Sequence, residues 1–242
     1  MNILVVTPTY NEIENIRKLI PVLLSLRDDL NVLVVDDNSP DGTGNYVEDL
    51  SKNNDRVFVL KRPGKMGLGT AYIDGFDWAL KHPKNFGYII QMDADFSHNP
   101  DKILEFIEKL DAGYDVVVGS RYLNGVSVVN WPIKRLMLSY FANWYARTFS
   151  GLKIKDCTGG FKGFKRTVLE KIPFKHIHSD GYAFQIEVNY FCQKLGFKMV
   201  EVPIIFIDRH SGTSKLSRRI VYEAVFRVIV LFWDRLFNLK KV

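Results

Sequence analysis

Two aspartates near the middle of the chain, Asp93 and Asp95, are separated by one residue and follow an apolar run that begins at Tyr88. The run predicts a buried strand. Side chains alternate sides along a strand, so both carboxylates reach one ion only where the strand has given way to a turn. Carboxylate oxygens and substrate phosphates are the ligands that Mg²⁺ and Mn²⁺ prefer. The pair therefore predicts a Mg²⁺ or Mn²⁺ site that holds a diphosphate.

The surrounding elements decide whether the pair is more than two solvated loop acids. Over the first 120 residues, short apolar runs alternate with helix-like stretches. Alternation of this kind predicts an α/β fold, with a mostly parallel, Rossmann-like sheet covered by helices on both faces. The expected strands are Ile3–Val6, Val32–Val35, Val57–Leu60, Tyr88–Met92 and Val116–Val118. The expected helices are 11–25, 43–51, 69–80 and 100–110.

Ligands of such sheets bind at the carboxyl ends of the strands, where polar segments follow each predicted strand. In the first of these segments, Tyr10 offers a flat face to a nucleotide base and Glu12 offers an acceptor. The alternative is a helix N-terminus capped by Asn11. In the second, Asp36 and Asp37 can bond a ribose or base, or belong to an ordinary turn.

The second half predicts helices over 133–149 and 180–195, a loop and strand over 156–166 and a strand over 198–207. The last predicted helix, Ile220–Leu239, is unusually apolar. Its polar residues recur at helical spacing, which leaves a narrow polar stripe and a wide apolar face. That face suits a membrane surface or a membrane partner, but a helix that closes the core or an oligomer interface fits as well.

The longest apolar run of that segment, Val228–Trp233, is six residues and too short to span a membrane. We therefore expect an amphipathic membrane-surface or interface helix over 217–242. This arrangement predicts a peripheral protein at the cytoplasmic face of a membrane.

Composition narrows the class of partner. The 242 residues include 33 Lys and Arg against 27 Asp and Glu, a formal net charge of +6 that favours anionic partners. Cys157 and Cys192 lack the spacing of metal ligands and give no disulfide framework, so we expect the protein to lie in a reducing compartment. No glycine-rich dinucleotide fingerprint follows the first strand, which argues against a hydride-transfer dehydrogenase. No recognition helix or aromatic-and-lysine stripe indicates nucleic-acid binding.

Eight motifs occur in an order that resembles a known family. The chain is similar to GT-A inverting glycosyltransferases of family 2, and most closely to the dolichyl-phosphate (polyprenyl-phosphate) mannosyltransferases. The similarity runs from about residue 2 to residue 216, and it implies a GT-A glycosyltransferase catalytic domain over 1–216. The motifs are Pro8–Glu12, Asp36–Thr43, Gly67–Tyr72, Met92–His98, Gly119–Tyr122, Asp156–Phe161, Asp180–Glu187 and Asp208–Lys215.

The resemblance assigns roles by position. The guanosine pocket would be lined by Pro8, Tyr10, Glu12, Val35 and Asp37. The metal and diphosphate would be held by Asp93, Ala94 and Asp95, with Ser97 as a further metal contact. The phosphates of the sugar nucleotide or the acceptor would be contacted by Arg121, Arg209 and Lys215. The acceptor phosphate would lie at Arg135 and Ser139.

The resemblance implies transfer of mannose from GDP-mannose to a polyprenyl phosphate with inversion, with Asp93, Asp95 and Arg121 as the catalytic residues. It also implies a soluble or peripheral member of the family, of a kind that sometimes depends on a small membrane partner subunit. Two alternatives remain open: a polyprenyl-phosphate glucosyltransferase that uses UDP-glucose, and a non-catalytic scaffold that binds a sugar nucleotide.

Overall fold

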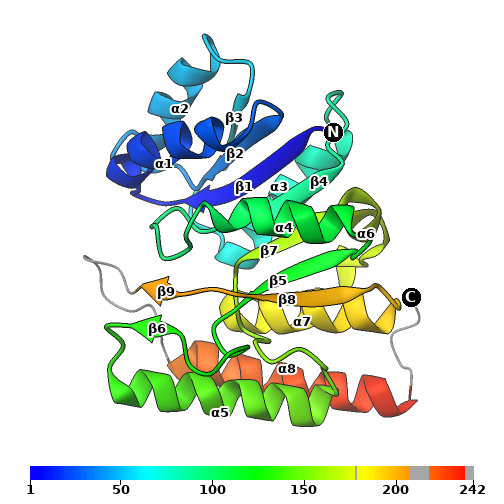
Figure 1. Cartoon of the computed structure of the whole chain (residues 1–242). Helices are drawn as coiled ribbons and strands as arrows, with labels where there is room; N and C mark the ends of the chain where they lie inside the picture. The colour runs from blue at the N-terminus through cyan, green and yellow to red at the C-terminus, as the bar shows by residue number, and fades with distance from the viewer. Residues whose placement is uncertain (178, 208–217, 238–242) are drawn as a thin grey trace.

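A seven-stranded sheet forms the centre of the molecule (Figure 1). The computed structural model describes residues 1–177, 179–207 and 218–237. The strand order is β3-β2-β1-β4-β7-β5-β8, and every strand is parallel to its neighbours except β7, which is antiparallel to both β4 and β5. The strands are β1 (Ile3–Thr9), β2 (Leu30–Asp36), β3 (Val57–Lys61), β4 (Tyr88–Gln91), β5 (Val116–Ser120), β7 (Lys162–Lys165) and β8 (Met199–Pro203).

Helices cover both faces of this sheet, as the alternating pattern predicted. One face carries α1 (Ile13–Leu26), α2 (Thr43–Ser51) and α4 (Lys102–Asp111). The other carries α3 (Leu68–Lys81), α6 (Arg166–Lys171) and α7 (Gly181–Lys194), and a short 3₁₀ helix spans Phe174–His176. The central strands β1 and β2 are apolar along most of their length because side chains on both faces are buried. The predicted fold class, a mostly parallel α/β sheet, is confirmed.

Two local predictions need correction. The strand predicted over 198–207 is two strands: β8 joins the main sheet, and β9 (Phe206–Ile207) pairs with β6 (Val128–Val129) in a separate ribbon. The first helix begins at Ile13, so Asn11 is not its cap. Asn11 has a φ of 60°, and the Ile13 N–H donates instead to the Asp41 carboxylate at 3.0 Å.

Two long helices, α5 (Ile133–Ser150) and α8 (Arg218–Phe237), lie side by side as an outer layer beyond α7 (Figure 1). Buried Val228 and Leu231 join α8 to the core on the α7 side of the sheet. The carboxylate of Asp234, 1% exposed, accepts hydrogen bonds from Tyr190 at 2.7 Å and Lys194 at 2.8 Å. The α8 helix therefore closes the core with one face, which is one of the roles expected for it.

No helix within the described ranges is both long and apolar enough to cross a bilayer. The predicted boundary between residues 216 and 217 lies outside the described residues.

Candidate active site

The carboxyl ends of four neighbouring strands meet at one edge of the sheet. Backbone hydrogen bonds continue past the strands: the Asp37 N–H donates to the Thr9 carbonyl at 3.0 Å, and the Arg62 N–H donates to the Asp36 carbonyl at 2.8 Å. On the other side of β1, the Met92 N–H donates to the Val6 carbonyl at 3.2 Å. These bonds bring together the segments that follow β1, β2, β3 and β4, which is where parallel sheets bind ligands.

The Asp93–Asp95 pair lies on a tight turn directly after β4. Phe96 has a φ of 58°, a conformation uncommon for an aromatic residue, and it turns the chain back after Asp95. The Ser97 N–H then donates to the Asp95 carboxylate at 3.1 Å. The strand has therefore ended before the carboxylates, as a shared ion would require.

Two buried rings fix Asp93. The Tyr72 hydroxyl donates to its carboxylate at 2.9 Å, and the backbone N–H of Asp93 donates to Nδ1 of His98 at 3.3 Å. Burial, reinforced by the Asp93 carboxylate, raises the pKa of Tyr72, so the phenol keeps its proton and stays a donor. Burial also lowers the pKa of His98, which favours the neutral ring that accepts at Nδ1.

The donor set of this turn fits a hard divalent cation that a substrate completes. The described residues contain no group of three or more His, Cys, Asp or Glu side chains arranged to hold a metal alone. The hydroxyl of Ser97, 2% exposed, has no hydrogen-bond partner among the described residues, which leaves it available beside the two aspartates. Magnesium-type ions commonly take one or two carboxylates and complete their shell with water and phosphate oxygens.

The predicted nucleotide residues lie along the same edge, with one exception. The Lys65 ammonium lies 4.7 Å from the centre of the Tyr10 ring, and the Glu12 carboxylate accepts from Asn15 at 2.6 Å. Pro8 is half-buried and pairs in register with Val35. The Val35 side chain is 0% exposed and belongs to the core beneath α3, so only its backbone is left to contact a nucleotide.

Asp37 contacts a buried arginine that is not one of the predicted site residues. Arg62, 5% exposed, donates to Asp37 at 2.8 Å and to the Thr70 hydroxyl at 2.7 Å. Burial raises the pKa of Asp37, although the Arg62 charge opposes this. The signal in the sequence was weak, because Arg62 is a single cation in a polar segment after β3.

Asp180 is a second residue whose position the sequence did not reveal. Its carboxylate accepts from the Gly69 N–H at 2.7 Å and from the Gly181 N–H at 2.8 Å, so it caps the N-termini of both α3 and α7. Gly67 has a φ of 105°, and a Cβ there would lie 2.6 Å from this carboxylate. Only glycine fits at position 67, and the loop before α3 is thereby fixed against α7.

Arg121 is held in a buried ion pair. The guanidinium, with the residue 4% exposed, makes two bonds of 2.7 Å to Asp156, and the Arg121 backbone N–H adds a third at 3.0 Å. Burial opposes both charges, but each charge favours the other and holds the pKa of Asp156 below its ordinary value. A bond of 2.8 Å to Thr158 completes the group. The predicted catalytic role of Arg121 stays a prediction, since these donors already have protein partners.

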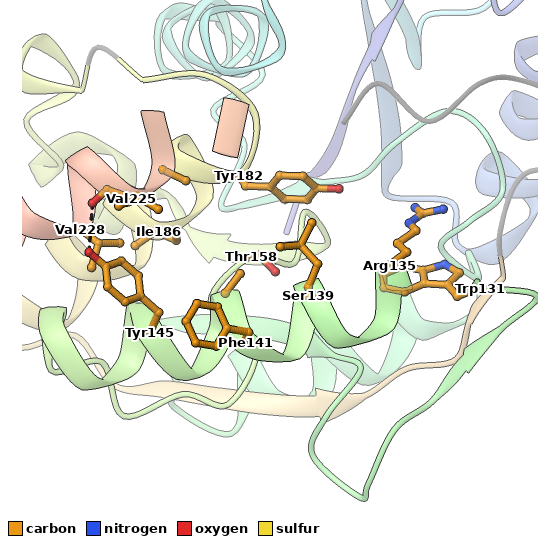
Figure 2. A pocket seen from close by; sticks show the side chains of 13 residues that line it. Trp131, Arg135, Ser139, Phe141, Tyr145, Thr158, Tyr182, Ile186, Val225 and Val228 are labelled. Atoms are coloured by element: carbon orange, nitrogen blue, oxygen red, sulfur yellow. Dashed lines mark hydrogen bonds between the residues drawn. The ribbon is translucent and has the colours of Figure 1, made fainter. Parts of the chain in front are cut away.

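Arg135 and Ser139 line a pocket between α5, α7 and α8 with about 780 Å³ of space, part of it open to solvent. Figure 2 shows Arg135 and Trp131 at one end and the apolar side chains of Val225 and Val228 at the other. The Arg135 guanidinium stacks 4.2 Å from the centre of the Trp131 ring. The pocket therefore has a cationic end and a long apolar end.

One loop joins this pocket to the aspartate turn. A Cβ at Gly160 would lie 3.7 Å from Oδ2 of Asp93, while Thr158, two residues earlier, lines the pocket. Tyr122, next to Arg121, donates to Ser139 at 2.7 Å. The predicted donor and acceptor residues are therefore neighbours in space. Arg209 and Lys215 lie outside the described residues.

Comparison with known families gives the class of protein. The model of glycosyl transferase family 2 matches residues 4–173, well over half of the chain. The chain belongs to this family.

Two relatives agree with this membership, and a solved structure has a similar fold. The chain is 44% identical to the polyprenol monophosphomannose synthase of Mycolicibacterium smegmatis, over 93% of this chain and 84% of the relative. It is 40% identical to the undecaprenyl-phosphate mannosyltransferase of Micrococcus luteus, over 94% and 93%. Its fold is similar to glucosyl-3-phosphoglycerate synthase of Mycobacterium tuberculosis bound to UDP, with a TM-score of 0.68 at 17% identity, over 96% and 80% of the two chains.

The Arg121–Asp156 pair gives the first prediction. Asp156→Asn leaves a buried arginine without its counter-charge, and we expect it to lower the free energy of unfolding by about 3–5 kcal/mol. Asp29→Asn removes an aspartate from a more exposed pair with Arg27 and should cost less than about 1 kcal/mol. Urea unfolding of the two variants tests this. Equal losses would show that burial of the Asp156 pair has no special effect.

A second prediction concerns Lys162, which is 0% exposed and whose pKa burial lowers to about 7. The unfolded chain, with a lysine pKa of 10.5, binds more protons above pH 7. Stability should therefore rise with pH from 7 to 9 relative to Lys162→Met, by about 1 kcal/mol per pH unit. Urea unfolding at three pH values measures this, with exposed Lys18→Met as the control for lost charge. Parallel curves for wild type and Lys162→Met would contradict it.

Proposed function

We propose that the protein transfers mannose from GDP-mannose to a polyprenyl phosphate, giving polyprenyl phosphomannose and GDP with inversion. The observation that carries the proposal is the pocket between α5, α7 and α8 beside the Asp93–Asp95 turn. A cationic end next to a long apolar end suits a phosphate on a hydrocarbon chain (Figure 2). Two relatives at 44% and 40% identity are named for the transfer of mannose to a polyprenyl phosphate.

Each substrate has side chains suited to it. The Arg135 guanidinium and the Ser139 hydroxyl match the oxygens of a phosphate, and the apolar residues beyond them match isoprene units. The edge formed by Tyr10, Glu12 and Asp37 offers a ring face and acceptors for a nucleoside. Asp93, Asp95 and Ser97 would hold a divalent cation, Mg²⁺ or Mn²⁺. When bound, this ion neutralises charge on the diphosphate leaving group.

The reaction needs little acid–base chemistry. An oxygen of the acceptor phosphate attacks the anomeric carbon, a new carbon–oxygen bond forms, and the bond to GDP breaks with its electron pair leaving on GDP. The acceptor phosphate is already anionic at neutral pH, since phosphate monoesters have a second pKa of about 6. Arg135 would orient this oxygen, and Tyr72 and His98 would hold Asp93 in place. Positioning and electrostatics therefore account for the rate.

The exposed faces of α5 and α8 support a position at an anionic membrane surface. Val225 and Val228 of the pocket belong to α8, so a chain in the pocket lies beside this surface. The charged residues of α5 are all basic: Lys134, Arg135 and Arg147. Exposed apolar side chains recur at helical spacing on both helices. They are Ile133, Met137, Tyr140, Phe141 and Trp144 on α5, and Tyr222, Phe226, Ile229, Trp233 and Phe237 on α8.

A transfer assay tests the proposed function. Wild-type protein with Mn²⁺ or Mg²⁺ should move radiolabel from GDP-mannose into chloroform-soluble polyprenyl phosphate, and EDTA should abolish the transfer. Asp95→Ala should lose turnover at least a hundredfold while the melting temperature falls by no more than about 4 °C, because it removes a ligand of the metal and one hydrogen bond of the turn but no core contact. Near-normal turnover of Asp95→Ala would contradict the metal role.

The same assay separates the alternatives. Label from UDP-glucose in place of GDP-mannose would keep the reaction class and replace the donor. Binding of either sugar nucleotide without transfer to any lipid phosphate would favour the non-catalytic scaffold, or a missing membrane partner subunit.

A vesicle assay tests the membrane position. We expect wild-type protein to sediment with vesicles that contain anionic lipid and much less with zwitterionic ones. Phe226→Ser with Trp233→Ser should weaken binding at least tenfold, since each lost aromatic side chain removes about 1.5–3 kcal/mol of burial. The matched control is Val22→Ser with Leu104→Ser, each 38% exposed on α1 and α4. Equal effects of the two double variants would contradict the assignment of this face.

A further inference from the structure

A buried carboxamide lies beside Asp93 with its orientation fixed by two neighbours. Gln185, on α7, is 3% exposed. Its Oε1 accepts from Nε2 of Gln91 at 2.9 Å and from Nζ of Lys162, which is fully buried on β7. Two donors, Gln91 Nε2 and Lys162 Nζ, converge on this one atom, so the oxygen of the carboxamide lies toward both of them. The nitrogen of Gln185 therefore points away from this pair.

That nitrogen faces a small space in front of Gly160. A Cβ at Gly160 would lie 3.8 Å from Nε2 of Gln185, 3.8 Å from Cε1 of His98 and 3.7 Å from Oδ2 of Asp93. Among the described residues none accepts a hydrogen bond from this Nε2. The Gln185 residue is largely buried, and an N–H donor that has no acceptor among the described residues and is aimed at the side of a predicted metal ligand is suited to an oxygen of a bound molecule.

We propose that Gln185 binds the sugar nucleotide, donating from Nε2 to an oxygen of its diphosphate or its sugar. Gln91 and Lys162 act as positioning residues that hold the carboxamide in this orientation. Gly160 lacks a side chain because the substrate occupies the space in front of it. This inference rests on the proposed function, because Asp93 marks the donor site only if the protein binds a sugar nucleotide there.

Three variants separate binding from structure. Gln185→Leu keeps approximate shape and removes the donor, and Gln185→Glu adds a carboxylate beside Asp93, where it repels a phosphate. Gly160→Ala leaves the network of Gln91, Lys162 and Gln185 intact. A methyl group at position 160 meets its neighbours at ordinary contact distances, so this variant should fold normally while it fills the space. The control is Gln193→Leu, two turns along α7. It removes a carboxamide that bonds only backbone groups of the 151–153 loop.

The experiment is calorimetric titration of GDP and GDP-mannose in the presence of Mn²⁺, together with transfer kinetics and melting temperatures. We expect Gln185→Leu to weaken GDP-mannose binding and lower kcat/KM ten- to a hundredfold, and Gly160→Ala to do the same at unchanged melting temperature. Gln185→Glu should bind more weakly still, and Gln193→Leu should stay within twofold of wild type. Equal losses for GDP and GDP-mannose assign the bond to the diphosphate, and a loss for GDP-mannose alone assigns it to the sugar.

Other results overturn the inference. The inference is wrong if Gly160→Ala and a folded Gln185→Leu both bind GDP-mannose within twofold of wild type. It is also wrong if these variants change only the KM for the lipid phosphate. If Gln185→Leu does not fold, Gly160→Ala decides alone. A wild-type protein that binds neither GDP-mannose nor UDP-glucose overturns the proposed function and this inference together. Binding by wild type with unaffected variants overturns the inference alone.

Discussion

The site depends on the buried ion pair between Asp156 and Arg121. Asp156 is 0% exposed, and its carboxylate neutralises Arg121 through two bonds of 2.7 Å. The backbone N–H of Asp156 donates to Glu201 at 2.9 Å. The residues that follow it extend this connection, because the Cys157 N–H donates to Asn143 of α5 at 2.7 Å. An unpaired charge at this depth would be strongly destabilising, so the pair fixes where the 156–160 loop runs.

The course of that loop sets the relation between the two predicted substrate sites. Thr158 lines the pocket between α5, α7 and α8, and Gly160 faces Asp93. A phosphate at the cationic end of the pocket would therefore approach a sugar nucleotide at the aspartate turn without a large movement of either. Two anionic substrates repel each other in water, and the Arg135 guanidinium at the cationic end of the pocket would offset part of this repulsion. Fixed groups of this kind lower a barrier because they need no rearrangement during the reaction.

The α8 helix of the outer layer packs on the core with one face and exposes apolar side chains on another. Asp234 and Leu231 of α8 are buried, and Asp234 accepts from Tyr190 and Lys194, while Trp233 is 48% exposed. Glu223 of the same helix accepts from the Asp180 N–H at 3.0 Å, and Asp180 in turn caps α3 and α7. The helix that carries the apolar surface is thus bonded, through one residue, to the loop at the nucleotide edge.

The sequence by itself determined the sheet, its polar edge and the turn at Asp93 and Asp95, because buried strand runs and the residues after them are local signals. The eight ordered motifs led to the family that the comparison confirms. Only the tertiary structure decided which partner each polar side chain takes. Arg121 pairs with a residue 35 positions away, and Asp180 caps a helix 111 positions away. The roles of Asp180 and Gln185 depend on such contacts, which no spacing in the sequence encodes, because burial decides pairing in space and not along the chain.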